Sequence, residues 1–282
     1  MDYKLGKLPV KYDSRNIKLR NIFRIKLLPP LPNDFDVDSS IGGLVDDRMF
    51  ANDQWGDCVI AGRAHHTMRF EKYEQGVLIN ILDSEVLDEY WKEQGDGSHP
   101  DNGLVMLDSL NRWRHDGWIA ATKHYDIYAY AEVGCKELNE VKYSIYLLYG
   151  AYAGLFLPLS AQSQIQNGQI WSVTSGPESL PGTWGGHCVY LVSYDDTGPT
   201  CMTWGKRQQM TWEFWMKYAE ECYCIVDNKD AWVDPSTSPL DIQKLDGYLH
   251  EISGTTDTPP QLSPICTKVR KFFRALNKNL RG

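Results

Sequence analysis

The 282-residue sequence lacks any apolar run of about 18 residues, the length that a membrane-spanning helix needs. Its N-terminus also lacks the apolar segment of a secretory signal peptide. Neither Cys-x-x-Cys nor His-Glu-x-x-His spacing occurs, so we expect no metal and no other cofactor. Seven cysteines, an odd number without a disulfide-like framework, favour a reducing compartment. We expect a protein without a transmembrane segment, either cytoplasmic or released without a signal peptide, for instance in a virion.

Charge is unevenly distributed along the chain. Residues 1–30 contain eight Lys and Arg against two acidic residues, and residues 265–282 contain six Lys and Arg and no acidic residue. The part between them has a net charge of −20. An acidic body argues against nucleic acid as a substrate of the catalytic part. We expect the basic ends to dock on that body, or to bind an anionic partner such as a membrane surface or a nucleic acid.

Hydrophobic patterns predict an α+β protein. With 42% hydrophobic residues, the chain can bury a sizeable core. Helical spacing of apolar residues follows Cys58 and recurs at 104–113 and 138–148, whereas strand-like runs come later, at 151–159, 187–192, 200–204 and 222–226. Helices early and antiparallel strands late are typical of two lobes with a site between them.

Cys58 lies where a turn rich in amides and glycine leads into an apolar helical pattern. Ile60, Ala64 and Met68 recur four residues apart, which predicts a helix that begins at the thiol. Unpaired N–H groups and the positive end of the helix dipole lower the pKa of a thiol placed there. Because the thiolate is the reactive form, we predict that Cys58 is a nucleophile with a lowered pKa.

His187 follows the thiol by 129 residues, within Gly-Gly-His-Cys-Val on a predicted strand. A histidine beside Cys58 would hold the thiolate as an ion pair and later protonate the leaving group. Asn52 and Gln54 precede the thiol by six and four residues and are candidates for the amide donor of an oxyanion hole. A cysteine at a helix start with a distant strand histidine is the arrangement of nucleophilic cysteine hydrolases.

Several stretches of the chain are similar to segments of one enzyme family. They are the opening at 5–9 with 13–15, then 31–38, the nucleophile segment 52–61, the region 100–118, the histidine strand 185–194 and 203–205. In these stretches the chain resembles the papain-like cysteine peptidases, in particular bacterial and phage-borne members without a long propeptide. The resemblance implies a two-lobed fold, with the nucleophile helix in a helical lobe and the histidine strand in an antiparallel β lobe. It also implies hydrolysis of peptide or protein substrates through a thioester.

One position departs from this family. The asparagine that orients the histidine in papain-like enzymes aligns here with Met202, which cannot accept a useful hydrogen bond. We therefore expect a Cys58–His187 dyad. Strand alternation puts Met202 and Trp204 on one face and Thr203 on the other. We expect Met202 and Trp204 to shield His187 by apolar packing, and Thr203 to orient it only if the strand bulges.

Two alternatives remain open. Asp57 and Cys58 at a helix start, followed by a strand histidine, also occur in NlpC-type cell-wall endopeptidases and amidases. A polar residue shortly after His187 on the next strand would favour that function, and none is obvious. Met202 also leaves room for a catalytically inactive scaffold, such as a phage virion or interaction protein.

Composition, together with the family resemblance, predicts four parts in the chain. Residues 1–30 form an extended basic leader, and 31–252 form the papain-like catalytic domain. Residues 253–264 are a linker rich in Ser, Thr, Pro and Gly, and 265–282 form a basic amphipathic tail.

Overall fold

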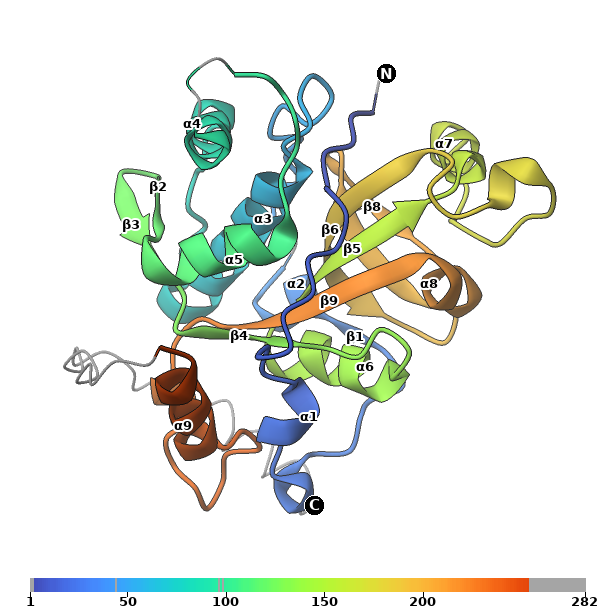
Figure 1. Cartoon of the computed structure of the whole chain (residues 1–282). Coiled ribbons are helices and arrows are strands. Elements are labelled where there is room, and N and C mark those ends of the chain that lie inside the picture. Colours follow the sequence, from blue (N-terminus) through green and yellow to red (C-terminus); the bar gives the residue numbers. More distant parts are fainter. Residues whose placement is uncertain (1–2, 44, 96, 98, 254–282) are drawn as a thin grey trace.

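A group of helices and an antiparallel sheet stand side by side in the computed structural model, with the N-terminal segment between them (Figure 1). The structure describes residues 3–43, 45–95, 97 and 99–253. The α+β prediction is confirmed. The predicted tail and all of the predicted linker except Ser253 lie outside the described residues.

The helical lobe is built around α3 (Cys58–Gln75). This helix lies between the sheet and the two helices α4 (Asp83–Gln94) and α5 (Met106–His115), next to a short hairpin of β2 (Trp118–Ala120) and β3 (Lys123–Tyr125) (Figure 1). The helix begins at Cys58, as predicted. No helix among the described residues is long and apolar enough to span a bilayer.

The β lobe is one sheet with strand order β4-β9-β5-β6-β7-β8, and β1 pairs with β6. All these pairings are antiparallel. The strands are β1 (Phe35–Asp36), β4 (Ala129–Glu132), β5 (Ala151–Leu157), β6 (Gly185–Tyr194), β7 (Pro199–Thr203), β8 (Lys206–Gln209) and β9 (Ala219–Val226). Because β6 is paired on both sides and also packs against α3, it is a rigid support for His187.

Short helices surround the sheet. They are α2 (Val37–Ser40), α6 (Leu138–Leu147), α7 (Leu159–Gln166) and α8 (Trp212–Tyr218), with 3-10 turns at η2 (Pro177–Ser179) and η3 (Asp230–Trp232). The Thr211 hydroxyl accepts the backbone N–H of Phe214 and so begins α8, as a threonine N-cap does. The helix α9 (Ile242–Ser253) lies within the range predicted as catalytic domain, although the sequence analysis did not identify it.

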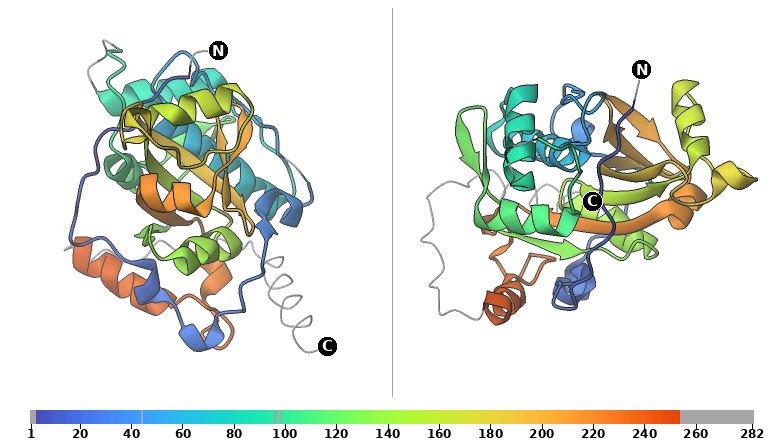
Figure 2. Two further views of the ribbon diagram at one scale, coloured as in Figure 1. Left: turned by 90° about the vertical axis from the view of Figure 1, so that its right-hand side faces the viewer. Right: turned by 45° about the horizontal axis from the view of Figure 1, so that its top comes forward.

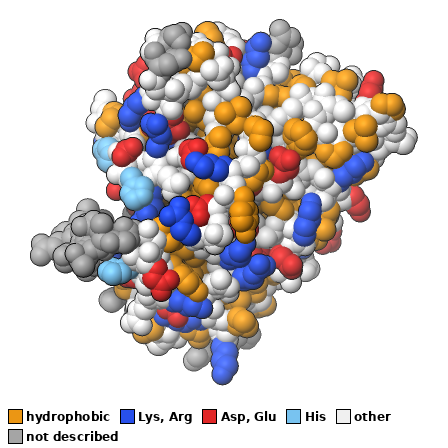
Figure 3. Space-filling model, viewed as in Figure 1, with side chains coloured by type: hydrophobic (Ala, Val, Ile, Leu, Met, Phe, Trp, Pro, Cys, Tyr) orange, Lys and Arg blue, Asp and Glu red, His pale blue; other side chains and the backbone are white. Residues whose placement is uncertain are grey.

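The basic leader docks on the acidic body. Its cations pair with body carboxylates at Lys7–Glu221, Lys11–Asp108, Lys18–Glu132, Arg20–Glu140 and Arg24–Asp241. On the face that the leader crosses, Lys and Arg alternate with Asp and Glu instead of forming one patch (Figure 3). The leader is not extended throughout, since it contains α1 (Leu19–Ile22) and the 3-10 turn η1 (Ile25–Leu27). It passes beside α9, where Phe23 bridges to Leu240 just before that helix (Figure 2). Near its end, Pro29 accepts a hydrogen bond from Tyr143 of α6.

Candidate active site

Cys58 is the first residue of α3 and is 1% exposed. Its sulfur accepts a hydrogen bond from the backbone N–H of Cys188, at 3.4 Å. Cys188 directly follows His187 on β6, so the structure brings the predicted nucleophile to the predicted histidine strand. The backbone N–H of Cys58 has no acceptor within its own helix, because it belongs to the first turn.

His187 has two different nitrogen environments. Its Nε2 lies 2.6 Å from the hydroxyl oxygen of Thr203. Its Nδ1 is buried and has no hydrogen-bond partner among the described residues. The imidazole also stacks on the indole of Trp204, with ring centroids 4.0 Å apart and planes within 7°. Thr203 and Trp204 therefore hold the ring, and Nδ1 remains available to a reacting group.

Strand register explains why Thr203, and not Met202, contacts His187. Met202 lies directly opposite Tyr190, and residues opposite each other in a sheet point to the same face. Tyr190 is three residues from His187, so it points to the other face of β6. The expectation that Met202 packs on His187 is therefore wrong. Thr203 lies on the histidine's face because the β6–β7 pair contains a β-bulge between Leu191 and Ser193, which shifts the register by one residue. The expected bulge is thus present, in β6 and not in the strand that carries Thr203.

Trp204 reaches His187 because of the turn that follows β7. Trp204 and Gly205 have φ values of 44° and 70° and connect Thr203 to its partner Lys206. Two consecutive residues with positive φ are typical of a type I′ hairpin turn. The turn takes Trp204 out of strand alternation, so Trp204 stacks on His187 as expected, although Met202, predicted on the same face, does not.

Aromatic rings extend from the histidine to the N-terminus. Trp204 lies 5.3 Å from Trp184 and 4.7 Å from the ring of Tyr3, measured between centroids. No role was predicted for Trp184 from the sequence. Its position directly before the Gly-Gly-His motif was the available signal.

The two candidate oxyanion donors differ in position. Asn52 is buried, and its Nδ2 donates to the carbonyl of Trp55 at 2.9 Å. Gln54 is exposed. Neither amide makes a hydrogen bond with Cys58 among the contacts of the described residues. The backbone N–H of Cys58, which has no acceptor within its own helix, is a further candidate donor.

Residues 3–8, here called the plug segment, cross directly over Cys58. Lys7 donates its backbone N–H to Gly186 on the sheet side, at 3.2 Å. On the helical side, Leu104 donates to the carbonyl of Gly6 at 2.8 Å and accepts from Leu8 at 2.9 Å. Residues 1–30 were predicted to form a leader, but the position of residues 3–8 over Cys58 was not predicted.

Gly6 is the point of closest approach. A Cβ built on Gly6 would lie 1.6 Å from the carbonyl oxygen of Gly56, so no other residue fits there without movement. The backbone N–H of Gly6 also faces the sulfur of Cys58. The plug segment therefore covers the sulfur and presents a backbone N–H group to it.

Burial controls the ionisation of both residues. It raises the pKa of Cys58 to about 12, against the opposing effect of the Cys188 N–H group. Burial also lowers the pKa of His187 to about 3. Both groups are therefore neutral at pH 7 beneath the plug segment. The predicted lowering of the thiol pKa is wrong for this closed arrangement, because loss of water outweighs the helix start.

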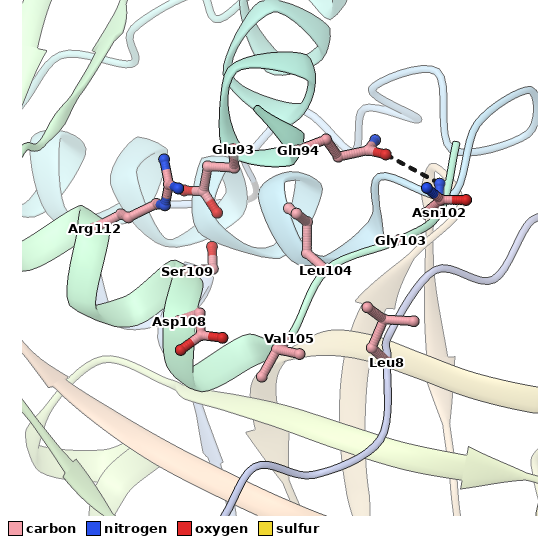
Figure 4. Close-up of a pocket in the computed structure, with 10 residues that line it drawn as sticks. All are labelled: Leu8, Glu93, Gln94, Asn102, Gly103, Leu104, Val105, Asp108, Ser109 and Arg112. Atoms are coloured by element: carbon pink, nitrogen blue, oxygen red, sulfur yellow. Dashed lines mark hydrogen bonds between the residues drawn. The ribbon is translucent and has the colours of Figure 1, made fainter. Parts of the chain in front are cut away.

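A pocket of about 450 Å³ adjoins the plug segment on the helical lobe. Leu8 and Leu104 form part of its wall, and Glu93, Gln94 and Arg112 project from α4 and α5 (Figure 4). Neither Cys58 nor His187 lines it. Among the described residues, no group of His, Cys, Asp and Glu is arranged to hold a metal ion.

Comparison with known proteins connects this geometry to a fold. No family model and no curated protein matches the sequence. Solved structures do match. A cysteine protease of Xylella fastidiosa, xylellain, superposes with a TM-score of 0.63 at 15% identity, covering 80% of this chain and 97% of that one. The fold is that of the papain-like cysteine proteases.

Two further papain-like structures support the assignment. A Carica candamarcensis cysteine protease, solved in complex with E-64, gives a TM-score of 0.52 at 14% identity, over 70% of this chain and all of that one. Procathepsin B of Trypanosoma congolense gives 0.55 at 13% identity, over 80% and 87% of the two chains. At these identities the likeness establishes the papain-like fold, and the activity is a separate question.

Proposed function

We propose that this chain is a cysteine peptidase, with Cys58 as nucleophile and His187 as general base and acid, covered by its own plug segment. The observation that carries the proposal is the position of His187, directly before the Cys188 N–H group that contacts the Cys58 sulfur. Its Nε2 lies at hydrogen-bond distance of the Thr203 hydroxyl, whereas its buried Nδ1 has no hydrogen-bond partner among the described residues. His65 and His66 also have buried nitrogens without such a partner, so the place of His187 on β6 is what distinguishes it.

The chemistry follows from these positions. Once substrate replaces the plug segment, His187 Nδ1 takes the thiol proton and the thiolate attacks the peptide carbonyl carbon. The backbone N–H of Cys58, joined by Asn52 or Gln54 if either amide turns inward, stabilises the oxyanion. His187 returns the proton to the leaving amine, which leaves a thioester on Cys58. Water, deprotonated by His187, then hydrolyses the thioester and restores the thiol.

Thr203 bears on the inactive-scaffold alternative. That alternative rested on the replacement of the orienting asparagine by Met202. The Thr203 hydroxyl lies within hydrogen-bond distance of His187 Nε2. Thr203 can therefore make the orienting contact that Met202 cannot make. The dyad thus has the second-residue support that a working histidine needs.

The test uses the full chain with Gly6→Ala, which removes the plug segment by steric clash. We expect this variant to cleave a mixed peptide library and to react with a thiol-directed epoxide at Cys58, as mapped by mass spectrometry. Cys58→Ala and His187→Ala on the same background should lose cleavage by several orders of magnitude, whereas Cys201→Ala, a buried thiol on β7, should retain it. Circular dichroism checks folding. Modification of Cys58 without any peptide cleavage would establish the inactive scaffold instead.

A further inference from the structure

The side chain of Lys7 lies in an acidic pocket beside the site. Its ammonium lies 3.0 Å from Glu220 Oε2 and 3.0 Å from Glu221 Oε1, and the side chain is only 1% exposed. Lysine is rarely buried so completely unless carboxylates surround it. The plug segment that carries it has no helix or regular strand, so the pocket must come from the body.

Gly154 forms the floor of this pocket. It lies on β5, opposite Glu221 on β9 and Cys188 on β6. A Cβ at Gly154 would lie 2.3 Å from Cε of Lys7 and 2.7 Å from Cγ of Glu221. Any larger residue would therefore fill the space that the aliphatic stem of Lys7 occupies. The sheet itself provides room for a long side chain.

Glu221 is oriented by the body and not by Lys7. The hydroxyl of Tyr223, two residues along β9, donates to Oε2 of Glu221 at 3.0 Å. The other oxygen, Oε1, makes no hydrogen bond among the described residues and faces the ammonium. Glu220, at 32% exposure, stands at the rim. Departure of Lys7 would leave a buried, aligned carboxylate without a counter-ion.

The pocket lies next to the reacting sulfur. Lys7 donates its backbone N–H to Gly186, the residue before His187, and its neighbour Gly6 faces Cys58. A peptide that follows the plug segment's path thus places one side chain in this pocket, adjacent to the residue over the thiol.

We propose that the pocket of Glu220, Glu221 and Gly154 selects substrates with a lysine or arginine beside the residue that lies over Cys58, and that Lys7 occupies it in the substrate's place. The inference deepens the proposed function and rests on it. A cationic side chain restores the counter-ion of Glu221, an apolar one leaves the carboxylate unpaired, and an acidic one is repelled.

Binding is measured first, apart from catalysis. The protein is the full chain with Gly6→Ala, Lys7→Met and Cys58→Ala, which removes the plug segment, the competing cation and the nucleophile. The probes are labelled heptapeptides with the sequence of residues 3–9, carrying Lys, Met or Glu in place of Lys7. By fluorescence anisotropy we expect the Lys peptide to bind about tenfold to a hundredfold more tightly than the Met peptide, and the Glu peptide more weakly still.

Substitutions in the pocket test which residue causes the preference for the Lys peptide. Glu221→Gln should reduce the Lys-over-Met ratio by about tenfold, and Glu221→Lys should reverse the order of the Lys and Glu peptides. Glu213→Gln, on the exposed face of α8, is the matched control and should leave the ratio unchanged. Equal binding of the Lys and Met peptides by a folded protein would overturn the proposal, and would leave Glu220 and Glu221 as anchors of the plug segment only.

A cleavage experiment distinguishes the proposed role of the pocket from the proposed peptidase activity. With Cys58 restored, peptides containing Lys or Arg at the pocket position should be cleaved with the highest kcat/KM. Cleavage without preference for a basic residue would overturn the pocket's role and keep the peptidase. A binding preference for Lys without cleavage of any peptide would support the pocket and refute the peptidase.

Discussion

Two cations in this molecule are each buried between two glutamates, but the segments that carry them are held in the fold by different contacts. Arg63 of α3 is 0% exposed and pairs with Glu89 and Glu93 of α4. Lys7 of the plug segment is equally buried between Glu220 and Glu221 of the sheet. The local electrostatics are similar, so the difference must come from the chain that carries each cation.

Arg63 sits in the middle of an 18-residue helix. Its guanidinium also donates to the carbonyl and the hydroxyl of Ser109 on α5, and it lies 5.4 Å from the ring of Trp113. It cannot leave without disrupting three helices. Lys7 belongs to a segment without a helix or regular strand. Backbone bonds to Asn52, Leu104 and Gly186 hold this segment, together with the Trp204 indole N–H on the carbonyl of Lys4. A similar ion cluster therefore joins two helices of the core in one place, and in the other it anchors an irregular segment over the candidate site.

The largest effect should follow Arg63→Met. This change leaves Glu93 buried without its cation and leaves Glu89 with Lys92 alone. Breaking a buried pair in this way costs about 3–5 kcal/mol. Urea unfolding followed by circular dichroism measures the free energy. The matched control is Arg20→Met, because Arg20 is 52% exposed and its bond to Glu140 is 3.5 Å. Loss of that pair should cost less than about 1 kcal/mol. Equal losses in the two variants would contradict the comparison.

Lys7→Glu should act on access to the site more than on stability. Burial alone would lower the pKa of Lys7, but attraction to Glu221 and Glu220 raises it, so the native cation stabilises the closed form. A glutamate there is repelled by the same carboxylates and should displace the plug segment. We expect alkylation of Cys58 at pH 7 to accelerate by about tenfold to a hundredfold, with a smaller stability loss than Arg63→Met. Unchanged alkylation would mean that the plug segment does not protect the thiol.

The pH dependence of alkylation sharpens this test. In the closed protein, burial raises the pKa of Cys58 to about 12, so the thiol is protonated at pH 7 and alkylation should continue to rise towards pH 12. Displacing the plug segment readmits water and so removes much of the burial that raises the pKa of Cys58. In Lys7→Glu the rise should therefore occur at lower pH, as measured by iodoacetamide rates between pH 5 and about 10. Coincident profiles would show that burial arises from the body alone.

Structural features that depend on a short local pattern of residues could be predicted from the sequence. The start of α3 at Cys58 follows from a turn that leads into helical spacing. The approach of its sulfur to the strand of His187 agrees with the predicted dyad, and the dyad itself stays a prediction. The face on which Met202 lies was predicted wrongly, because register belongs to two paired strands and cannot be read from one. The site of the plug segment was not predicted, since its partners Leu104 and Gly186 lie far along the chain. The uneven distribution of charge favoured docking of the basic leader on the acidic body, but it did not indicate which residues would make the contacts.

The smallest effect should come from Thr203→Val, which keeps the shape of the side chain and removes its hydroxyl. His187 would then lose the contact at Nε2, and its ring would be held by Trp204 alone. On the Gly6→Ala background we expect kcat/KM for peptides to fall by about tenfold, the value of one hydrogen bond.

Two companion variants identify the cause of that loss. Thr203→Ser keeps the hydroxyl and should retain most of the activity. Met202→Asn places an amide on the opposite face of β7, across from Tyr190, where it cannot reach His187. It should leave the rate of chemistry unimproved and lower stability, because a polar amide replaces a buried thioether. If Met202→Asn raised kcat while Thr203→Val had no effect, the register argument would be wrong and Met202 would be the position that orients the histidine.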